Sequence, residues 1–169
     1  MRIHVVGTSG SGKTTVARSA AARLGVPHLE LDAVRHQPNW TEMPNDEMWA
    51  VVTAFTTQHE AWVVDGNYGF VRDALWARAT HIVFLDLPRW RIMTQVIRRS
   101  FARAAFRREL WNGNTETFRS WADPTHPIRW AWTSRDRRRQ QYAESVATDP
   151  RWVVLTSRRE VQAWLGSLA

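Results

Sequence analysis

Eight residues near the N-terminus, GTSGSGKT at 7–14, narrow the folds open to this sequence more than any other stretch. They match the pattern G-x-x-x-x-G-K-[ST] at every required position. A short apolar run at 2–7 precedes them, and residues 13–24 have the composition of a helix. Because a strand before the loop and a helix after it are the context that this pattern needs, the sequence predicts a phosphate-binding loop, called the phosphate loop below.

The backbone and side chains of this loop predict a site for ATP and Mg²⁺. Gly10 lets the loop curl so that successive N–H groups point inward, and the following helix adds the positive end of its dipole. Lys13 is expected to bridge the terminal phosphates and Thr14 to hold the magnesium ion. The residues expected to contact the nucleotide are Gly7, Ser9, Gly10, Ser11, Gly12, Lys13, Thr14 and Thr15.

Lys13 is also the only lysine among the 23 basic residues of the chain. An ammonium group is a compact point charge, whereas a guanidinium group is a broad planar fork. We infer that the tight loop accepts only the lysine. The glycine spacing does not fit G-x-G-x-x-G, so a nicotinamide-dependent enzyme is disfavoured.

The rest of the chain alternates between short apolar runs and helical segments, which predicts a parallel sheet covered by helices on both faces. At 169 residues the chain suits one domain. The segment 89–108 has helical spacing, with Ile92, Val96 and Ile97 expected on one side and arginines on the other. The expected strands are 2–7, 28–32, 61–66, 81–88 and 151–156, and the expected helices are 13–24, 45–59, 70–77, 89–108, 127–146 and 158–168.

Three of the expected strands finish on aspartate: Asp32, Asp65 and Asp86. The carboxyl ends of parallel strands share one edge of the sheet, so all three should lie near the phosphate loop. Strand-end carboxylates beside a nucleotide either hold magnesium or its water ligands, or take a proton from an attacking hydroxyl. We assign Asp65 to the metal and the substrate and Asp32 to the acceptor substrate, and we expect Asp86 to be structural.

Charge and composition leave the partner class open. The net charge is +7, and the stretch from Arg89 to Arg139 carries 13 arginines against four acids. Such a basic block suits nucleic acid or the phosphates of a small ligand. The chain has no cysteine, so disulfides and thiolate metal sites are excluded. No apolar run approaches the roughly 18 residues of a membrane span, which favours a cytoplasmic protein without membrane contact.

The phosphate loop and several later motifs together resemble the nucleoside monophosphate kinase and shikimate kinase branch of P-loop kinases. The resemblance covers nearly the whole chain. The sequence resembles even more closely bacterial proteins identified as adenylate kinase-like or DNA topology modulation proteins. The motifs that carry the resemblance are LD at 31–32, QPNW at 37–40, VVDGN at 63–67, DGNY at 65–68, FLDLP at 84–88 and ELWNGN at 109–114.

The resemblance implies a three-layer α/β fold with a five-stranded parallel sheet of order 2-3-1-4-5, and a helical lid within about 98–119. It also implies roles for arginines, since guanidinium groups suit phosphates. Lid residues Arg98 or Arg99 and Arg103 would close on ATP phosphates. Arg135 or Arg138, one helical turn apart, would reach the transferring phosphoryl group. Arg72 would bind the acceptor, next to Asn67 of the DGNY motif.

The acceptor is left open, because the AMP-positioning motif of adenylate kinase and the glycine-rich signature of shikimate kinase are both missing. Trp40, Trp111 and Trp121, in expected loops, are placed either to stack on a base, sugar or aromatic ring or to pack at the rim. If the acceptor is a hydroxyl, Asp32 is the candidate base; for a nucleotide phosphate it only positions.

The favoured function is an ATP-dependent small-molecule kinase, acting as a monomer or homodimer. The alternatives are an ATP-binding, nucleic-acid-associated regulatory protein and a nucleotide-binding protein without chemistry.

Overall fold

The computed structural model describes residues 1–106, 111–114 and 127–168. Within these ranges no helix is both long and apolar enough to cross a bilayer. The lid expected at about 98–119 lies partly outside them: residues 98–106 end a helix, 111–114 form a short turn, and the rest of the lid is not described, nor is Trp121.

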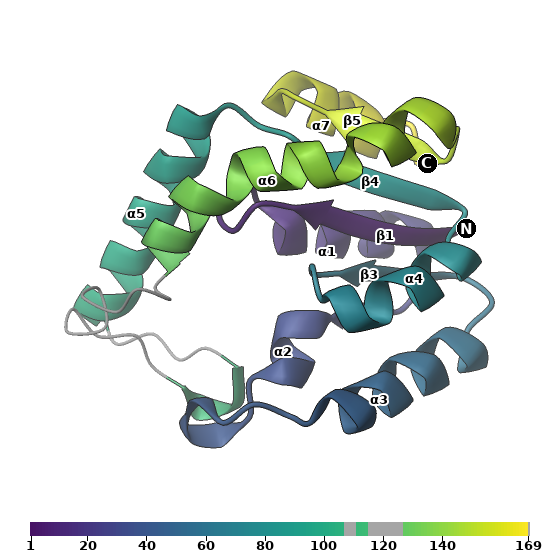
Figure 1. Ribbon diagram of the computed structural model, residues 1–169, viewed down its shortest axis with the longest axis horizontal. Coiled ribbons are helices and arrows are strands. Elements are labelled where there is room, and N and C mark those ends of the chain that lie inside the picture. Colours follow the sequence, from purple (N-terminus) through teal and green to yellow (C-terminus); the bar gives the residue numbers. More distant parts are fainter. Residues whose placement is uncertain (107–110, 115–126, 169) are drawn as a thin grey trace.

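The centre of the fold is a five-stranded parallel sheet of order β2-β3-β1-β4-β5, which confirms the expected topology (Figure 1). The register places Val5 beside Asp65 and Gly7 beside Leu85, so β3 and β4 flank the phosphate loop. The strands are β1 (Arg2–Gly7), β2 (His28–Glu30), β3 (Trp62–Asp65), β4 (His81–Leu85) and β5 (Trp152–Leu155).

Helices cover both faces of the sheet. The α-helices are α1 (Lys13–Leu24), α2 (Leu31–Arg35), α3 (Asn45–Gln58), α4 (Gly69–Arg78), α5 (Arg89–Phe106), α6 (Pro127–Thr148) and α7 (Arg158–Gly166), and the short 3-10 turns are η1 (Pro38–Trp40) and η2 (Trp111–Gly113). One core cluster joins the sheet to α1 and α7, and a second joins the opposite face to α3, α4 and α6. Their apolar side chains leave water on folding, which is the main favourable contribution to stability.

Helix α5 packs against α6 through a small separate core. Ile92 and Val96 are buried there beside Leu87 and Ala131. The prediction that Ile97 shares this side was wrong, since its side chain is 43% exposed. Residue 97 follows residue 96 by about 100° around the helix axis, which turns it away from the partner helix.

The second strand is shorter than the sequence indicated. It ends at Glu30, and Asp32 lies in the first turn of α2 rather than at a strand end. The other two aspartates are where they were expected: Asp65 ends β3 and Asp86 follows β4 directly.

Candidate active site

The phosphate loop joins β1 to α1 and is held by close packing at two glycines. Gly10 has φ 80°, and a Cβ there would lie 2.9 Å from Val96 Cβ of α5. A Cβ on Gly7 would lie 2.9 Å from the carbonyl oxygen of Leu85. Gly7 has φ 152°, so both positions require glycine for backbone conformation as well as space.

Asn67 fastens the start of this loop. Its amide oxygen accepts the Gly7 N–H at 3.2 Å, and its amide nitrogen donates to the Gly7 carbonyl at 2.6 Å. The sequence assigned Asn67 to the substrate, whereas in the structure both ends of its amide group are engaged with the loop backbone.

Lys13 begins α1 and its ammonium group donates to the Thr8 carbonyl at 3.2 Å. Burial lowers the pKa of Lys13, the carboxylates of Asp32 and Asp65 raise it, and the guanidinium groups of Arg99 and Arg138 lower it again. Electrostatic influence of this kind requires proximity. Two acids and two arginines from four separate segments thus act electrostatically on the single lysine.

A cluster of oxygen atoms lies beside Thr14. The Thr14 hydroxyl donates to Asp65 Oδ2 at 2.8 Å and, more weakly, to Glu30 Oε1 at 3.4 Å. The other oxygen of Asp65 lies 2.7 Å from Nε2 of His28. Asp65 is buried, and burial together with the neighbouring Asp65 charge raises the pKa of Glu30.

The oxygen atoms of this cluster fit the requirements of Mg²⁺ for its ligands. The ion prefers oxygen ligands and is commonly held by one or two carboxylates together with substrate phosphates and water. Thr14 and Asp65 supply two such oxygen-bearing groups at the end of the phosphate loop. Among residues 1–106, 111–114 and 127–168, no three histidine, cysteine, aspartate or glutamate side chains are grouped so as to hold a metal ion by themselves.

The loop also fits a phosphate. Gly12, which precedes α1, provides no side-chain cap, so the first N–H groups of the helix are not bonded by a cap. Within the described part of the chain, the buried hydroxyl of Ser11 has no hydrogen-bond partner. Ser9 is half-buried and Thr15 is exposed at the same helix end. Such donors are what a bound phosphate satisfies.

Asp32 lies in the first turn of α2. Its Oδ1 accepts a 2.8 Å hydrogen bond from the Tyr68 hydroxyl. Burial and the Asp32 charge raise the pKa of Tyr68, so its hydroxyl stays protonated and acts as a donor. Asp32 Oδ2 takes no part in this bond.

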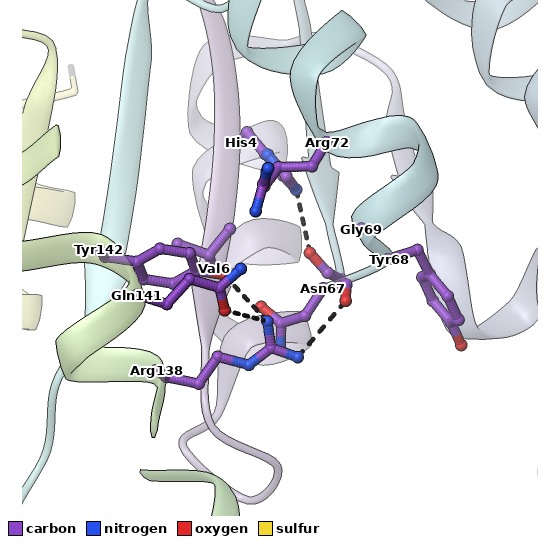
Figure 2. A pocket seen from close by; sticks show the side chains of 10 residues that line it. His4, Val6, Asn67, Tyr68, Gly69, Arg72, Arg138, Gln141 and Tyr142 are labelled. Atoms are coloured by element: carbon purple, nitrogen blue, oxygen red, sulfur yellow. Dashed lines mark hydrogen bonds between the residues drawn. The ribbon is translucent and has the colours of Figure 1, made fainter. Parts of the chain in front are cut away.

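A small recess, partly open to solvent, lies between α4 and α6. Figure 2 shows the guanidinium groups of Arg72 and Arg138 in it, on opposite elements. Arg138 donates to Gln141, to the Tyr142 hydroxyl and to the Asn67 carbonyl at 3.2–3.5 Å.

Arg135 and Arg138 have different surroundings, although they are one turn apart on α6. Arg135 donates to the Leu87 carbonyl at 3.1 Å and pairs with Asp86 at 3.3 Å. Asp86 also pairs with Arg139 at 2.9 Å. The expectation that Asp86 is structural thus has a geometric basis, since it ties α6 to the end of β4.

The three lid arginines on α5 also differ from one another. Arg98 is exposed, Arg99 is half-buried near Lys13, and Arg103 has its guanidinium carbon 6.0 Å from the centre of the Trp111 ring. Trp40 is 43% exposed and makes an edge contact with His36.

The sequence did not single out His28, Glu30 or Tyr68. His28 and Glu30 occupy alternate positions of β2, so they share one face, and the register places Glu30 beside Asp65. A sequence signal for His28 and Glu30 was available: they are two polar residues on one face of a short strand, and the neighbouring strand ends on an aspartate.

Comparisons with known proteins agree with this architecture. A family model described as an AAA domain (AAA_33) matches residues 3–111, which is more than half of the chain. No curated protein matches the sequence.

Solved structures with a similar fold include two kinases of small molecules. A shikimate kinase from Acinetobacter baumannii in complex with shikimate has a TM-score of 0.61 and 18% identity, covering 99% of this chain and 89% of that one. A gluconokinase from Sinorhizobium meliloti 1021 has a TM-score of 0.51 and 22% identity, covering 99% and 93%. At these identities the likeness concerns the fold. Because the matched family model runs from β1 to the first residue of η2 and so includes the phosphate loop, the chain belongs to the AAA domain family.

Proposed function

We propose that this protein is an ATP-dependent phosphotransferase that moves the γ-phosphoryl group to a small-molecule acceptor. The observation that supports it most directly is that Asp65 of β3 meets Thr14 of the phosphate loop at 2.8 Å, while Asp32, Asp65, Arg99 and Arg138 all influence the charge of Lys13. A nucleotide-binding protein without chemistry needs the loop, but it does not need two acids and two arginines that act on the same ammonium group.

Each group has a role in this proposal. The loop N–H groups and Lys13 bind the phosphates, and Arg99 and Arg138 stabilise the charge that spreads over the transferring group. Magnesium, which Thr14 and Asp65 would hold, supplies further neutralisation of the phosphate charge. Arg138 also donates to Asn67, which fastens the loop, so its position is tied to that of the loop.

The acceptor in this proposal carries a hydroxyl and an anionic group. Arg72 and Arg138 both line the recess between α4 and α6, and among the described residues that line it there is no carboxylate. Two guanidinium groups at one recess favour a carboxylate or a phosphate, and the exposed Asp73, which pairs with Arg72 at 2.8 Å, leaves the other donors of that guanidinium group for the acceptor. The hydroxyl would approach Asp32, whose Oδ1 is held by Tyr68 while Oδ2 accepts the proton. For a nucleoside monophosphate, as the adenylate kinase-like resemblance suggests, Asp32 would only position the acceptor.

A nucleic-acid-associated role is the less favoured alternative. Several arginines of the basic block already have acidic partners within the chain: Arg89 pairs with Asp136 at 2.5 Å, and Arg135 and Arg139 pair with Asp86. If the block bound duplex DNA, affinity would fall steeply with added salt as counterions are released. The proposal places the protein in the cytoplasm, as a monomer or homodimer.

The test is a transfer assay. Purified protein is incubated with labelled ATP, Mg²⁺ and two acceptor panels: small hydroxylated acids and nucleoside monophosphates. We expect a labelled product from one panel, and we expect Arg72→Gln to raise the acceptor KM roughly tenfold while leaving the ATP KM unchanged, since one charged hydrogen bond is lost. Slow hydrolysis with no transfer to any acceptor would overturn the proposal.

A further inference from the structure

Residues 111–114, called the strap below, dock on the acceptor side of the site rather than on the phosphate loop. In Figure 1 the η2 turn lies beside the segment that follows α2, and η2 contacts both α2 and η1. Asn112 donates to the His36 carbonyl at 2.6 Å. Asn114 is buried, accepts the Trp40 N–H at 2.8 Å and donates to the Gln37 carbonyl at 2.9 Å.

Trp111 makes the contacts that reach furthest into the site. Its ring stacks on His36 with centroids 5.4 Å apart, and its indole N–H donates to Glu30 Oε1 at 2.8 Å. The same Glu30 oxygen accepts the hydroxyl of Thr14 at 3.4 Å. Glu30 therefore links the strap to the first turn of the helix that follows the phosphate loop.

The backbone around the docked strap is strained. Trp40 has φ 58° and Asn112 has φ 55°, both in the left-handed region. This conformation is unfavourable for residues other than glycine, and especially for a bulky one such as tryptophan. Such a strained backbone conformation persists only where enough surrounding contacts hold it in place. The Asn114 bond to the Trp40 N–H is one of those contacts.

We propose that Trp111 is a positioning residue that holds the strap closed over the acceptor side and keeps water away from the phosphoryl group. This role rests on the proposed phosphotransferase function. The indole N–H gives the strap a direct connection to Glu30, and Glu30 in turn contacts Thr14. Glu30 thus anchors the strap at the edge of the site, and its contact with the Thr14 hydroxyl is the weaker of the two, at 3.4 Å against 2.8 Å for the indole.

The first test needs no activity. The Trp40 amide proton is bonded to Asn114 of the strap, so its hydrogen-exchange rate, followed by NMR, reports strap opening. Trp111→Phe keeps a ring for stacking but loses the N–H donor, and Trp111→Ala loses both. The matched control is Trp132→Phe, because Trp132 is 54% exposed on α6.

We expect exchange at Trp40 to accelerate by roughly tenfold or more in Trp111→Phe, the scale for losing a hydrogen bond to a charged group. We expect a larger effect in Trp111→Ala and none in the control. Acceleration in Trp111→Ala alone still supports the positioning role, with stacking as its basis. Unchanged exchange in both Trp111 variants would overturn it.

The second test separates strap closure from phosphate binding. In the Trp111 variants we expect a higher acceptor KM and a larger share of ATP lost to hydrolysis, with the ATP KM unchanged. A faster Trp40 exchange with an unchanged hydrolysis share would overturn the water-excluding role. If no acceptor is phosphorylated at all, the proposed function fails, whereas the exchange experiment still decides whether Trp111 holds the strap.

Discussion

The Lys13 ammonium group donates to the Thr8 carbonyl within the curl of the phosphate loop. The chain uses arginine at every other basic position, so the lysine is not a consequence of overall composition. A planar guanidinium group is broader and its donors are fixed in direction, so it cannot follow a phosphoryl group inside a ring of backbone N–H groups.

Replacing Lys13 by arginine conserves charge and should nevertheless remove nearly all transfer. We expect kcat to fall by about 100-fold or more, since a preorganised contact to the transferring group is lost. Far-UV circular dichroism should stay unchanged. The matched control is Arg23→Lys, an opposite exchange on an exposed residue at the end of α1, which should keep full activity. Near-normal activity of Lys13→Arg would contradict this account of the lone lysine.

His28 contacts the Asp65 oxygen that faces away from Thr14 and so limits rotation of that carboxylate. We expect His28→Leu to weaken the Mg²⁺ affinity of the ATP complex by about 10–100-fold, the usual effect of removing a group that orients a metal ligand. His28→Gln, whose terminal amide nitrogen reaches a similar position, should restore most of that affinity. Titration of Mg²⁺ into the protein with a non-hydrolysable ATP analogue measures both. Equal affinities in the leucine variant and the native protein would exclude this role.

At the scale of elements, α6 must be placed correctly for Arg138 to reach the site. Asp86, with a side chain only 8% exposed, binds Arg135 and Arg139 of that helix. Burial raises the pKa of Asp86, whereas its two arginine partners lower it. The ion pairs of Asp86 with the two arginines therefore serve mainly to position α6, and they are not a large source of stability.

Asp86→Asn should lower the free energy of unfolding by about 1–3 kcal/mol, a range reduced from that of a fully buried pair because Arg139 is largely exposed. We also expect a higher acceptor KM, because α6 carries Arg138. Asp136→Asn is the matched control: Asp136 pairs with Arg89 and Arg135 but is 60% exposed, so its loss should change stability by less than about 0.5 kcal/mol. Urea unfolding of the three proteins checks both values, and equal losses in the two variants would contradict this role for Asp86.

The elements also show where sequence patterns succeed. The start of α6 at Pro127 and the end of α1 before Gly25 follow from the fixed φ of proline and the left-handed cap of glycine. The burial of Ile97 was mispredicted, because the width of the buried stripe on α5 depends on how closely α6 approaches. The end of β2 was placed too late, since Leu31 and Asp32 suit a strand or a helical turn equally well.

For the whole molecule, acid stability should depend on His4. This residue is buried, its Nε2 lies 3.0 Å from the Gly66 carbonyl, and its Nδ1 accepts the indole N–H of Trp76 at 3.1 Å. These partners fix a neutral ring with the proton on Nε2. Burial is the main cause that lowers the pKa of His4 to about 4.

In the unfolded chain His4 takes up a proton near its ordinary pKa of 6.5, whereas in the folded protein it resists protonation until about pH 4. The unfolded state therefore binds more protons between these values, and folding stability falls as the pH falls through this window. The contribution of His4 to that fall is about 3 kcal/mol. His4→Gln should unfold with a shallower pH dependence between pH 6.5 and 4, measured by urea denaturation. An identical slope in the variant would mean that His4 is not the group responsible.

The sequence by itself determined the phosphate loop, the parallel α/β architecture and the strand-end position of Asp65. Each of these three features depends on residues that are close together in the sequence. The causes are the conformational freedom of glycine, the alternation of apolar runs with helical segments and the short range of backbone hydrogen bonds. Only the tertiary structure decided that Asn67 fastens Gly7, that His28 orients Asp65 and that Trp111 reaches Glu30. Those partners are 37 to 81 residues apart. Their meeting depends on strand register and on how helices and turns pack, which local periodicity does not specify.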